Sequence, residues 1–272
     1  MKAEEYRALQ EWLENYLAGF RENGVLPPML ELKRLHSLRV AENAALLAAM
    51  LRTGSGELRL ARAAGLLHDT GRFSQFRDYG SLRDSDTVDH AAEGRKVLEA
   101  QAAGLIKNER ERARLLGAVQ FHNRRTADIP AQEGRAGLLK LLRDADKLDI
   151  IEVVLRSVAA DGFRDLPEML PHIGPGRGLT PGLLAKAAAR QGLSSGELRT
   201  VADMLLLTAS WFYDLNYPAA HWLAARRGLL PRLRKELPGT EEVAVFFAGL
   251  ETWSGSAANG RQEEEQWTQK KS

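Results

Sequence analysis

The stretch Gly65–Phe73 reads GLLHDTGRF and closes an apolar run that begins near Glu57. Apolar residues recur at helical spacing up to Leu67, so we predict a helix that stops at His68-Asp69-Thr70-Gly71. The stop places an imidazole and a carboxylate side by side at a helix end. Neutral imidazole and carboxylate are ligands of divalent transition metals. The stretch thus predicts a helical element and a candidate pair of metal ligands.

Helical spacing continues on both sides of this stretch. We predict helices over residues 3–21, 30–51, 57–67, 89–103, 109–123 and 135–160, with further helices between 181 and 251. The period-two alternation of strands is not found convincingly anywhere. Residues 72–89 have no clear period and many turn residues, which predicts a long ordered loop of functional importance. The sequence therefore predicts an all-α fold.

Composition shifts divide the chain into five expected parts. They are an N-terminal helix packed on the core (1–29), a helical metal-binding core (30–160), a Pro- and Gly-rich loop (161–180), a C-terminal helical subdomain (181–253) and a disordered tail (254–272). A chain of 272 residues is long enough for a large core with an appended subdomain.

Composition also excludes several classes of function. The chain has no cysteine, which excludes disulfides, thiolate nucleophiles and zinc ribbons. Its 38 basic and 36 acidic residues nearly cancel, so nucleic acid is not an expected partner. No apolar run approaches the roughly 20 residues of a membrane span, and the N-terminus is too polar for a secretory signal. We expect a cytoplasmic protein that does not bind membranes.

Four of the six histidines lie within the predicted core: His36, His68, His90 and His122. His36 shares a helical face with Val40 and Leu47, and His122 ends an apolar stripe, so both are expected to project inward. A single inward histidine is usually a hydrogen-bonded core residue. Four of them beside inward carboxylates favour a metal site. His172 and His221, in contrast, are expected to be structural.

A second set of carboxylates lies in the segment RDADKLDII, which contains Asp144, Asp146 and Asp149. A polar stripe that faces solvent would explain them. However, Leu139, Leu142, Ile150 and Val153 share the face of Asp146. Burial of an unpaired carboxylate is costly, so an inward aspartate requires a cation.

The order of these residues resembles the H…HD…D signature of the HD-domain metal-dependent phosphohydrolase superfamily over residues 30–160. The resemblance implies an HD-domain-like helical bundle, here with additional C-terminal helices. It also implies that His36, His68, Asp69 and Asp146 bind a divalent metal such as Mn, Fe, Co, Ni or Zn. Asp146 is favoured over Asp144 because similar members place the last ligand directly before a basic residue.

The resemblance extends to a second ion. Some HD phosphodiesterases place two more histidines between the HD pair and the last aspartate, where they hold a second metal bridged by the HD aspartate. His90 and His122 have the right type and order for this role. The G-Y-P signature of the cyclic-di-GMP subgroup is absent, and so is the Glu-Asp pair that alarmone hydrolases use. One or two ions therefore remain open.

The implied activity is hydrolysis of a phosphate ester, a nucleotide or a related small phosphorylated molecule, by metal-activated water. Asp69 would bridge the ions, and Arg72 and Lys147 are candidates for stabilising charge on the phosphoryl group. Weaker candidates for substrate contact are Asn123, Arg124, Arg77 and Tyr79. Asp149 could orient a ligand, and the aromatic motif WFYDLNY at 211–217 is expected to pack in a core rather than stack on a base.

Two other classes of function remain open at this point. One is a non-catalytic module that senses a nucleotide or holds a structural metal. Such modules usually lose a ligand, and all four are present here. The other is a metal-dependent nuclease, which would require a broad basic surface. The leaving group, the metal and a homo-oligomeric state are likewise left open.

Overall fold

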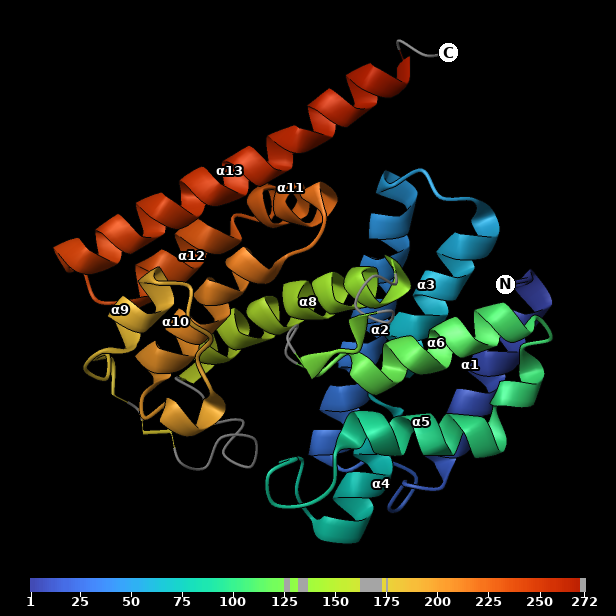
Figure 1. Ribbon diagram of the computed structural model, residues 1–272. Helices are drawn as coiled ribbons and strands as arrows, with labels where there is room; N and C mark the ends of the chain where they lie inside the picture. Colours follow the sequence, from blue (N-terminus) through green and yellow to red (C-terminus); the bar gives the residue numbers. More distant parts are fainter. Residues whose placement is uncertain (125–127, 132–136, 162–172, 175, 270–272) are drawn as a thin grey trace. The chain divides into compact units, whose positions relative to one another are not determined.

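The computed structural model describes residues 1–124, 128–131, 137–161, 173–174 and 176–269, and helices joined by turns and loops make up this part of the chain (Figure 1). No strand ladder occurs in it, and the only β pairing consists of two isolated bridges, Glu22 with Val25 and Gly174 with Thr200. The predicted all-α fold is confirmed. No helix in the same residues is long and apolar enough to cross a membrane.

The helices agree with the predicted ranges at most positions. In chain order they are α1 (Ala3–Ala18), α2 (Pro28–Met50), α3 (Ser55–Leu67), α4 (Thr70–Tyr79), α5 (His90–Gln101), η1 (Ala103–Leu105), α6 (Glu109–Phe121), α8 (Gly137–Asp161), α9 (Leu183–Ala188), η3 (Ser195–Glu197), α10 (Val201–Ser210), η4 (Trp211–Asp214), α11 (Pro218–Arg226), α12 (Leu229–Glu236) and α13 (Glu241–Gln269).

The chain divides into two compact units, Met1–Asp149 and Ile150–Ser272. The division falls within α8, whereas the composition placed a boundary in the loop 161–180. Much of that loop, together with His172, lies outside the described residues. In the first unit α1 packs on α3, which agrees with the expected place of the N-terminal helix.

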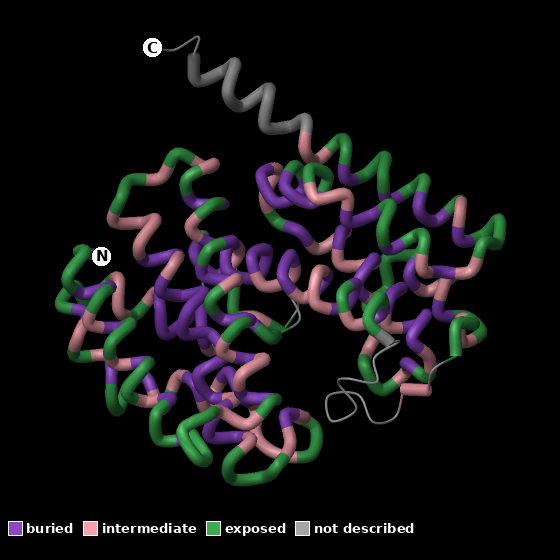
Figure 2. The backbone as a smooth tube through the Cα atoms, turned by 180° about the vertical axis from the view of Figure 1, so that it is seen from behind, coloured by how far each residue is buried: buried purple, intermediate pink, exposed green. Residues whose placement is uncertain are grey.

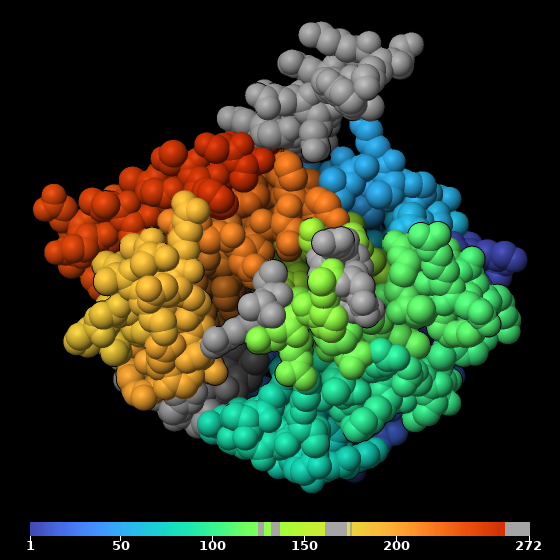
Figure 3. Space-filling view, viewed as in Figure 1, coloured from blue at the N-terminus to red at the C-terminus, as the bar shows by residue number. Residues whose placement is uncertain are grey.

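Two close helix crossings shape the first unit. A Cβ atom at Gly65 would lie 2.7 Å from the Cα of Ala41, so α3 and α2 are in backbone contact. A Cβ at Gly71 would lie 2.1 Å from the carbonyl oxygen of His90, so α4 and α5 are equally close. Buried residues gather in the interior of the first unit and exposed ones on its outside (Figure 2), and the segments that contain α4 and α5 adjoin on the surface seen in Figure 3. Both crossings lie next to candidate metal ligands.

One part of the prediction is wrong. Residues 72–89 are not a loop throughout, because α4 occupies Thr70–Tyr79 and ends at Gly80, which has a φ of 65°. Its helical period is hidden because it buries polar side chains, Ser74 and Gln75, beside Phe73. The expected disorder of the tail 254–272 stays a prediction, and in the structure α13 continues to Gln269. That segment contains Ala, Glu and Gln, which have high helix propensity.

The second unit packs α9–α13 around apolar residues that include Phe212 and Phe247, both almost fully buried. Within the motif at 211–217, Phe212 enters this core and the ring of Tyr213 meets Phe246 and Trp253 edge-on. The expectation that these aromatics pack is consistent with these contacts. His221 is buried and its Nδ1 lies 3.0 Å from Ser254 Oγ, as expected for a structural histidine.

Candidate metal centre

The candidate ligands come from six helices, and four of the six ligands lie at helix ends. His36 lies within α2, and His68 and Asp69 form the junction between α3 and α4. His90 is the first residue of α5, His122 follows the last residue of α6, and Asp146 lies in α8. Asp89 caps α5, because its carboxylate accepts the backbone N–H groups of Ala91 and Ala92. The cap fixes the direction in which α5 starts, and thus the position of His90.

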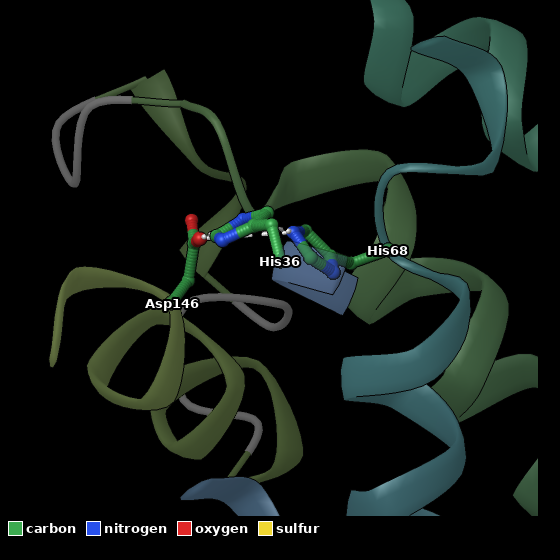
Figure 4. Close-up of side chains that lie close together, drawn as sticks. All are labelled: His36, His68 and Asp146. Carbon is green, nitrogen blue, oxygen red and sulfur yellow. Dashed lines mark hydrogen bonds and ion pairs between the residues drawn. The ribbon is translucent and has the colours of Figure 1, made fainter. Parts of the chain in front are cut away.

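The first ligand group consists of His36, His68 and Asp146 (Figure 4). His36 Nε2 lies 3.2 Å from His68 Nε2 and 3.0 Å from Asp146 Oδ1, and His68 Nε2 lies 3.6 Å from the same oxygen. Ligand atoms held at about 2.1 Å from one tetrahedral ion lie roughly 3.4 Å apart. The three atoms therefore have the spacing that one ion requires.

A second ligand group is formed by His90, His122 and Asp69. The two Nε2 atoms lie 3.1 Å apart, and Asp69 Oδ1 lies 3.3 Å from that of His90 and 3.8 Å from that of His122. Both predicted extra histidines thus lie beside the HD aspartate. The spacing is again that of a shared ion.

Asp69 connects the two groups through its two oxygens. Oδ1 faces the second group, whereas Oδ2 lies 3.7 Å from His36 Nε2 and 3.6 Å from His68 Nε2 in the first. A carboxylate arranged in this way can bind one ion with each oxygen. The bridging position that the resemblance assigned to Asp69 agrees with this geometry.

All four imidazoles are oriented through Nδ1. His36 and His90 meet carboxylates, Asp149 at 2.7 Å and Asp84 at 2.6 Å. His68 and His122 each meet the backbone carbonyl oxygen three residues earlier, at 2.7 Å in both cases. Carbonyl and carboxylate oxygens only accept hydrogen bonds, so each Nδ1 carries the proton. Each Nε2 is left with a lone pair that points into the centre.

The donor set fits a divalent metal. Two facing lone pairs about 3 Å apart repel one another unless a cation lies between them, and the centre contains two such imidazole pairs. In addition, Asp146 Oδ1 is buried and accepts no hydrogen bond within the described part of the chain. A buried carboxylate oxygen without a donor is costly. Ions at the two groups would satisfy all of these atoms.

Burial and local charge keep most of the histidines neutral. Burial lowers the pKa of His90 to about 4, assisted by Arg72, and burial likewise lowers the pKa of His122 to about 4, assisted by His68. Burial also lowers the pKa of His68. In His36 burial is outweighed by the carboxylates of Asp146 and Asp149, so its pKa is raised. Neutral imidazole is the form that binds metal.

The carboxylates of the centre stay ionised. Burial would raise the pKa of Asp69, but Lys33 and neighbouring imidazoles hold it well below its usual value. The pKa of Asp146 is also lowered despite burial, chiefly by His36. Asp149 follows the same pattern through His36 and Arg39. The centre therefore combines anionic oxygens with three imidazoles that are kept neutral, and a metal ion at His36 would have to compete with a proton.

Two residues of the centre, Lys33 and Asp84, were not predicted from the sequence. Lys33 is buried one helical turn before His36 and donates from Nζ to Asp69 Oδ2 at 2.9 Å. Its spacing from His36 was the available signal. Asp84 accepts hydrogen bonds from Arg72 and Gln75 besides its contact with His90. Asp84 lies among turn residues and no periodicity marks it, so the sequence held no clear signal.

Arg72 lies against the centre, but its guanidinium already has partners. It donates to Asp84 at 2.7 Å and to Gln75 at 2.9 Å, and its Nε lies 3.6 Å from Asp69 Oδ1. These contacts support the loop that orients His90. Binding of phosphate by Arg72 stays a prediction, and it would require some of these bonds to be exchanged.

Asn123 and Arg124 connect the two helix ends that carry the second group. Asn123 donates to Asp89 at 2.9 Å and to Asp84 at 3.2 Å, and Arg124 pairs with Asp89. Asp84, Asp89 and His90 also lie close enough to form a third acidic group. Its oxygens already accept these donors, so we assign it a supporting role.

The remaining predicted residues lie at different distances from the chemistry. Lys147 follows Asp146 in α8 and is half-buried. Tyr79 is 53% exposed at the end of α4, and Arg77 pairs with Asp78 at 2.6 Å. Asp144 is fully buried, but it is Asp146 that joins His36 and His68. The structure therefore places Asp146 at the first group.

Residues 35–151 match the family model of the HD domain. The matched range contains all six candidate ligands, from His36 to Asp146. This part of the chain is therefore an HD domain, and the resemblance seen in the sequence is confirmed. HD domains bind divalent metals and are generally metal-dependent phosphohydrolases. The chain matches no curated protein and no solved structure with significance.

Proposed function

We propose that this protein hydrolyses a phosphate ester, either a nucleotide or a related small phosphorylated molecule, with two divalent transition-metal ions. The observation that carries the proposal is the position of Asp69. Its two oxygens face two separate imidazole pairs, at 3.3 to 3.8 Å. A bridging carboxylate between paired ions is suited to in-line displacement at phosphorus.

We assign the residues of the centre to metal binding, ligand orientation and charge stabilisation. His36, His68 and Asp146 would hold one ion, His90 and His122 the other, and Asp69 both. Bound divalent ions would supply Lewis acidity and lower the pKa of a water molecule. Asp149 and Asp84 would keep His36 and His90 in the tautomer that binds metal. Lys147, next to Asp146, would stabilise charge that develops on the phosphoryl oxygens.

The second ion would be held more weakly than the first. The first group offers two imidazoles and two carboxylate oxygens, whereas the second offers two imidazoles and one oxygen of Asp69. Water or substrate would complete the second group. We therefore expect two binding events of different affinity in a metal titration, the weaker of which the double variant His90→Ala/His122→Ala loses.

The test is a hydrolysis screen of the full chain in Mn²⁺ buffer against aryl phosphate mono- and diesters and a panel of nucleotides. We expect activity that chelation abolishes and that Asp69→Ala removes together with the metal. Asp78→Asn changes an exposed carboxylate whose ion-pair partner among the described residues is Arg77, and this control should retain both the metal and the activity. Stoichiometric metal without turnover on any ester would instead support a sensing or structural module.

Lys147 provides a finer test of the same proposal. Its assigned partner is the phosphoryl group and not an ion, so Lys147→Ala should lower kcat while the protein keeps its metal. Equal losses of metal and activity would make Lys147 a support of the centre and contradict its assigned role.

A further inference from the structure

Lys33 brings an ammonium group into the interior of the metal centre. Its side chain is 10% exposed, and its Nζ lies 2.9 Å from Asp69 Oδ2. An ammonium has three N–H donors, and Asp69 is its one hydrogen-bond partner within the described residues. Its other two N–H groups have no hydrogen-bond partner among the described residues, and the ammonium lies beside a carboxylate that faces four candidate ligand imidazoles. Neither of these two N–H groups has a role in the proposed hydrolysis described above.

The oxygen that accepts from Lys33 is also a candidate metal ligand. Asp69 Oδ2 lies 3.7 Å from His36 Nε2 and 3.6 Å from His68 Nε2, which places it in the first group. A carboxylate oxygen has two lone pairs, so it can bind an ion with one and accept from Lys33 with the other. An ammonium and a divalent ion would then share one oxygen. Asp69 lies against both cations, but its single negative charge does not balance an ammonium and a divalent ion, so the two still repel one another.

The charges around the centre indicate the chemistry of a further anion that would balance these cations. Asp149 is balanced by Arg39, and Asp84 by Arg72. The negative charges of Asp69 and Asp146 remain to be balanced. Among the described ion pairs with lysine or arginine, Lys33 pairs closely with Asp69, and Arg72 makes a longer contact with the same residue. One divalent ion already makes this remainder positive, and a second ion increases the excess. An oxyanion that touches both the ion and the ammonium would restore balance.

We propose that Lys33 forms an oxyanion subsite, in which its ammonium binds a phosphoryl oxygen of the substrate beside the ion held by His36, His68 and Asp146. Lysine binds phosphate as a point charge and needs no fixed angle. A flexible four-carbon stem anchored on α2 can turn from Asp69 toward the incoming oxygen. The inference rests on the proposed hydrolysis of phosphate esters, for which it supplies a phosphate-binding residue.

The subsite makes opposite predictions for metal and for phosphate. In Lys33→Met, Asp69 no longer shares its oxygen with an ammonium, so the affinity for Mn²⁺ should rise several-fold. Inorganic phosphate should bind the Mn²⁺-loaded variant about 10- to 100-fold more weakly than the wild type, the range expected for the loss of a charge-assisted hydrogen bond. Calorimetric titration of Mn²⁺, and then of phosphate, measures both changes without any assay of turnover.

Two further variants make the experiment decisive. Lys186→Met removes a lysine of the other unit that pairs with Glu197, and it should change neither affinity. Lys33→Gln keeps an N–H donor for Asp69 without the charge, and it replaces Lys33→Met if that variant does not fold. Loss of Mn²⁺ affinity together with phosphate affinity would show that Lys33 only supports Asp69. Unchanged phosphate affinity would also overturn the subsite.

The outcome separates this inference from the proposed function. Wild-type protein that binds Mn²⁺ and phosphate through Lys33, yet cleaves no ester, would support the subsite and contradict the hydrolase. If the wild type cleaves esters and Lys33→Met binds phosphate as tightly as the wild type, the hydrolase is supported and the Lys33 subsite is contradicted.

Discussion

The imidazoles of the centre differ in the group that holds Nδ1. His36 and His90 donate to carboxylates, whereas His68 and His122 donate to backbone carbonyl oxygens within the same chain segment. A carboxylate partner makes an imidazole a more basic ligand than a neutral carbonyl does. Each ligand group contains one imidazole of either kind. Changes at Asp149 and at Asp84 should therefore alter the metal affinity of the first and of the second ligand group separately.

Replacing these carboxylates should weaken one group at a time. Asp149→Asn removes the charge behind His36 and should weaken the first ion, and Asp84→Asn should weaken the second. Loss of such a partner typically costs about 10- to 100-fold in metal affinity. A two-site calorimetric titration measures both events. Asp78→Asn is again the matched control, and a Asp84→Asn variant that weakened both ions equally would contradict the assignment.

The sequence identified the six candidate ligands because imidazole and carboxylate occurred in a recognisable order. The supporting residues were harder to find. Lys33 is one of several lysines, and apart from its spacing of one helical turn from His36 only its burial against Asp69 distinguishes it. Asp84 meets His90 because the chain turns back after α4, which no local pattern encodes. Asn123 and Arg124 were weaker candidates for substrate contact, and that role stays a prediction; in the structure they bind Asp84 and Asp89.

At the scale of elements, two glycines allow the helices that carry the ligands to approach closely. Gly71 is the second residue of α4, two residues after Asp69, and its Cα faces the start of α5 at His90. An added Cβ would meet the carbonyl oxygen of His90 at 2.1 Å and the amide nitrogen of Gly94 at 2.4 Å. Both are backbone atoms, so no side chain can move aside. The helices themselves must separate.

Gly71→Ala should therefore disturb folding and the second ion together. Overpacking of this kind costs about 1–3 kcal/mol. The displaced helix carries His90, so the weaker binding event should be lost before the stronger one. Urea denaturation and metal titration measure the two effects. Gly104→Ala, in η1 of the same unit, adds a Cβ with no atom within 4 Å and should change neither.

Whether a helix could be predicted depended on whether it buries apolar side chains at regular spacing. Helices α2, α3, α5 and α6 bury apolar side chains at regular spacing, which the sequence displays directly. Helix α4 instead buries Gln75, whose amide donates to Asp84, Thr87 and the carbonyl oxygen of Val88. Polar burial of this kind depends on partners distant in sequence. A periodicity of apolar residues cannot reveal it.

In the second unit a single carboxylate organises the start of α10. Asp203 is fully buried and accepts hydrogen bonds from Thr180 and from the backbone N–H groups of Arg199 and Thr200. Burial would raise its pKa, but these donors lower it. Asp203→Ala leaves several donors without an acceptor, and we expect a loss of about 3 kcal/mol or more in the free energy of unfolding.

The sign of the pH dependence follows from the lowered pKa of Asp203. The folded state holds the proton less tightly than the unfolded state, so the contribution of Asp203 is present above its unfolded pKa. It is lost as pH falls below about 4 and through the folded pKa. Urea denaturation at pH 7 and pH 3 should show a smaller difference between wild type and Asp203→Ala in acid. An equal difference at both values would contradict this account.

At the scale of the whole molecule, the centre lies in one compact unit and is built from distant parts of its sequence. His36 and Asp146 are separated by most of the first unit, yet they lie 3.0 Å apart. An ion bound at these ligands stabilises the folded arrangement of α2, α3 and α8 over any unfolded chain, in which no such site exists. Metal binding and folding of the unit are therefore coupled.

The coupling predicts a local effect of chelation. An ion present at about 100 times its dissociation constant adds roughly 2.7 kcal/mol to the free energy of unfolding. Hydrogen exchange should accordingly accelerate in α2, α3 and α6 when the ion is chelated, while α10 and α11 change much less.

Protons compete with the ion first at His36, whose pKa is raised, since His90 and His122 stay neutral down to a pH of about 4. The protection given by metal should thus decline as pH falls through the raised pKa of His36, and His36→Ala should remove it at every pH. Equal protection of both units by the metal, or metal protection that persists in His36→Ala, would contradict the assignment of the ion to this centre.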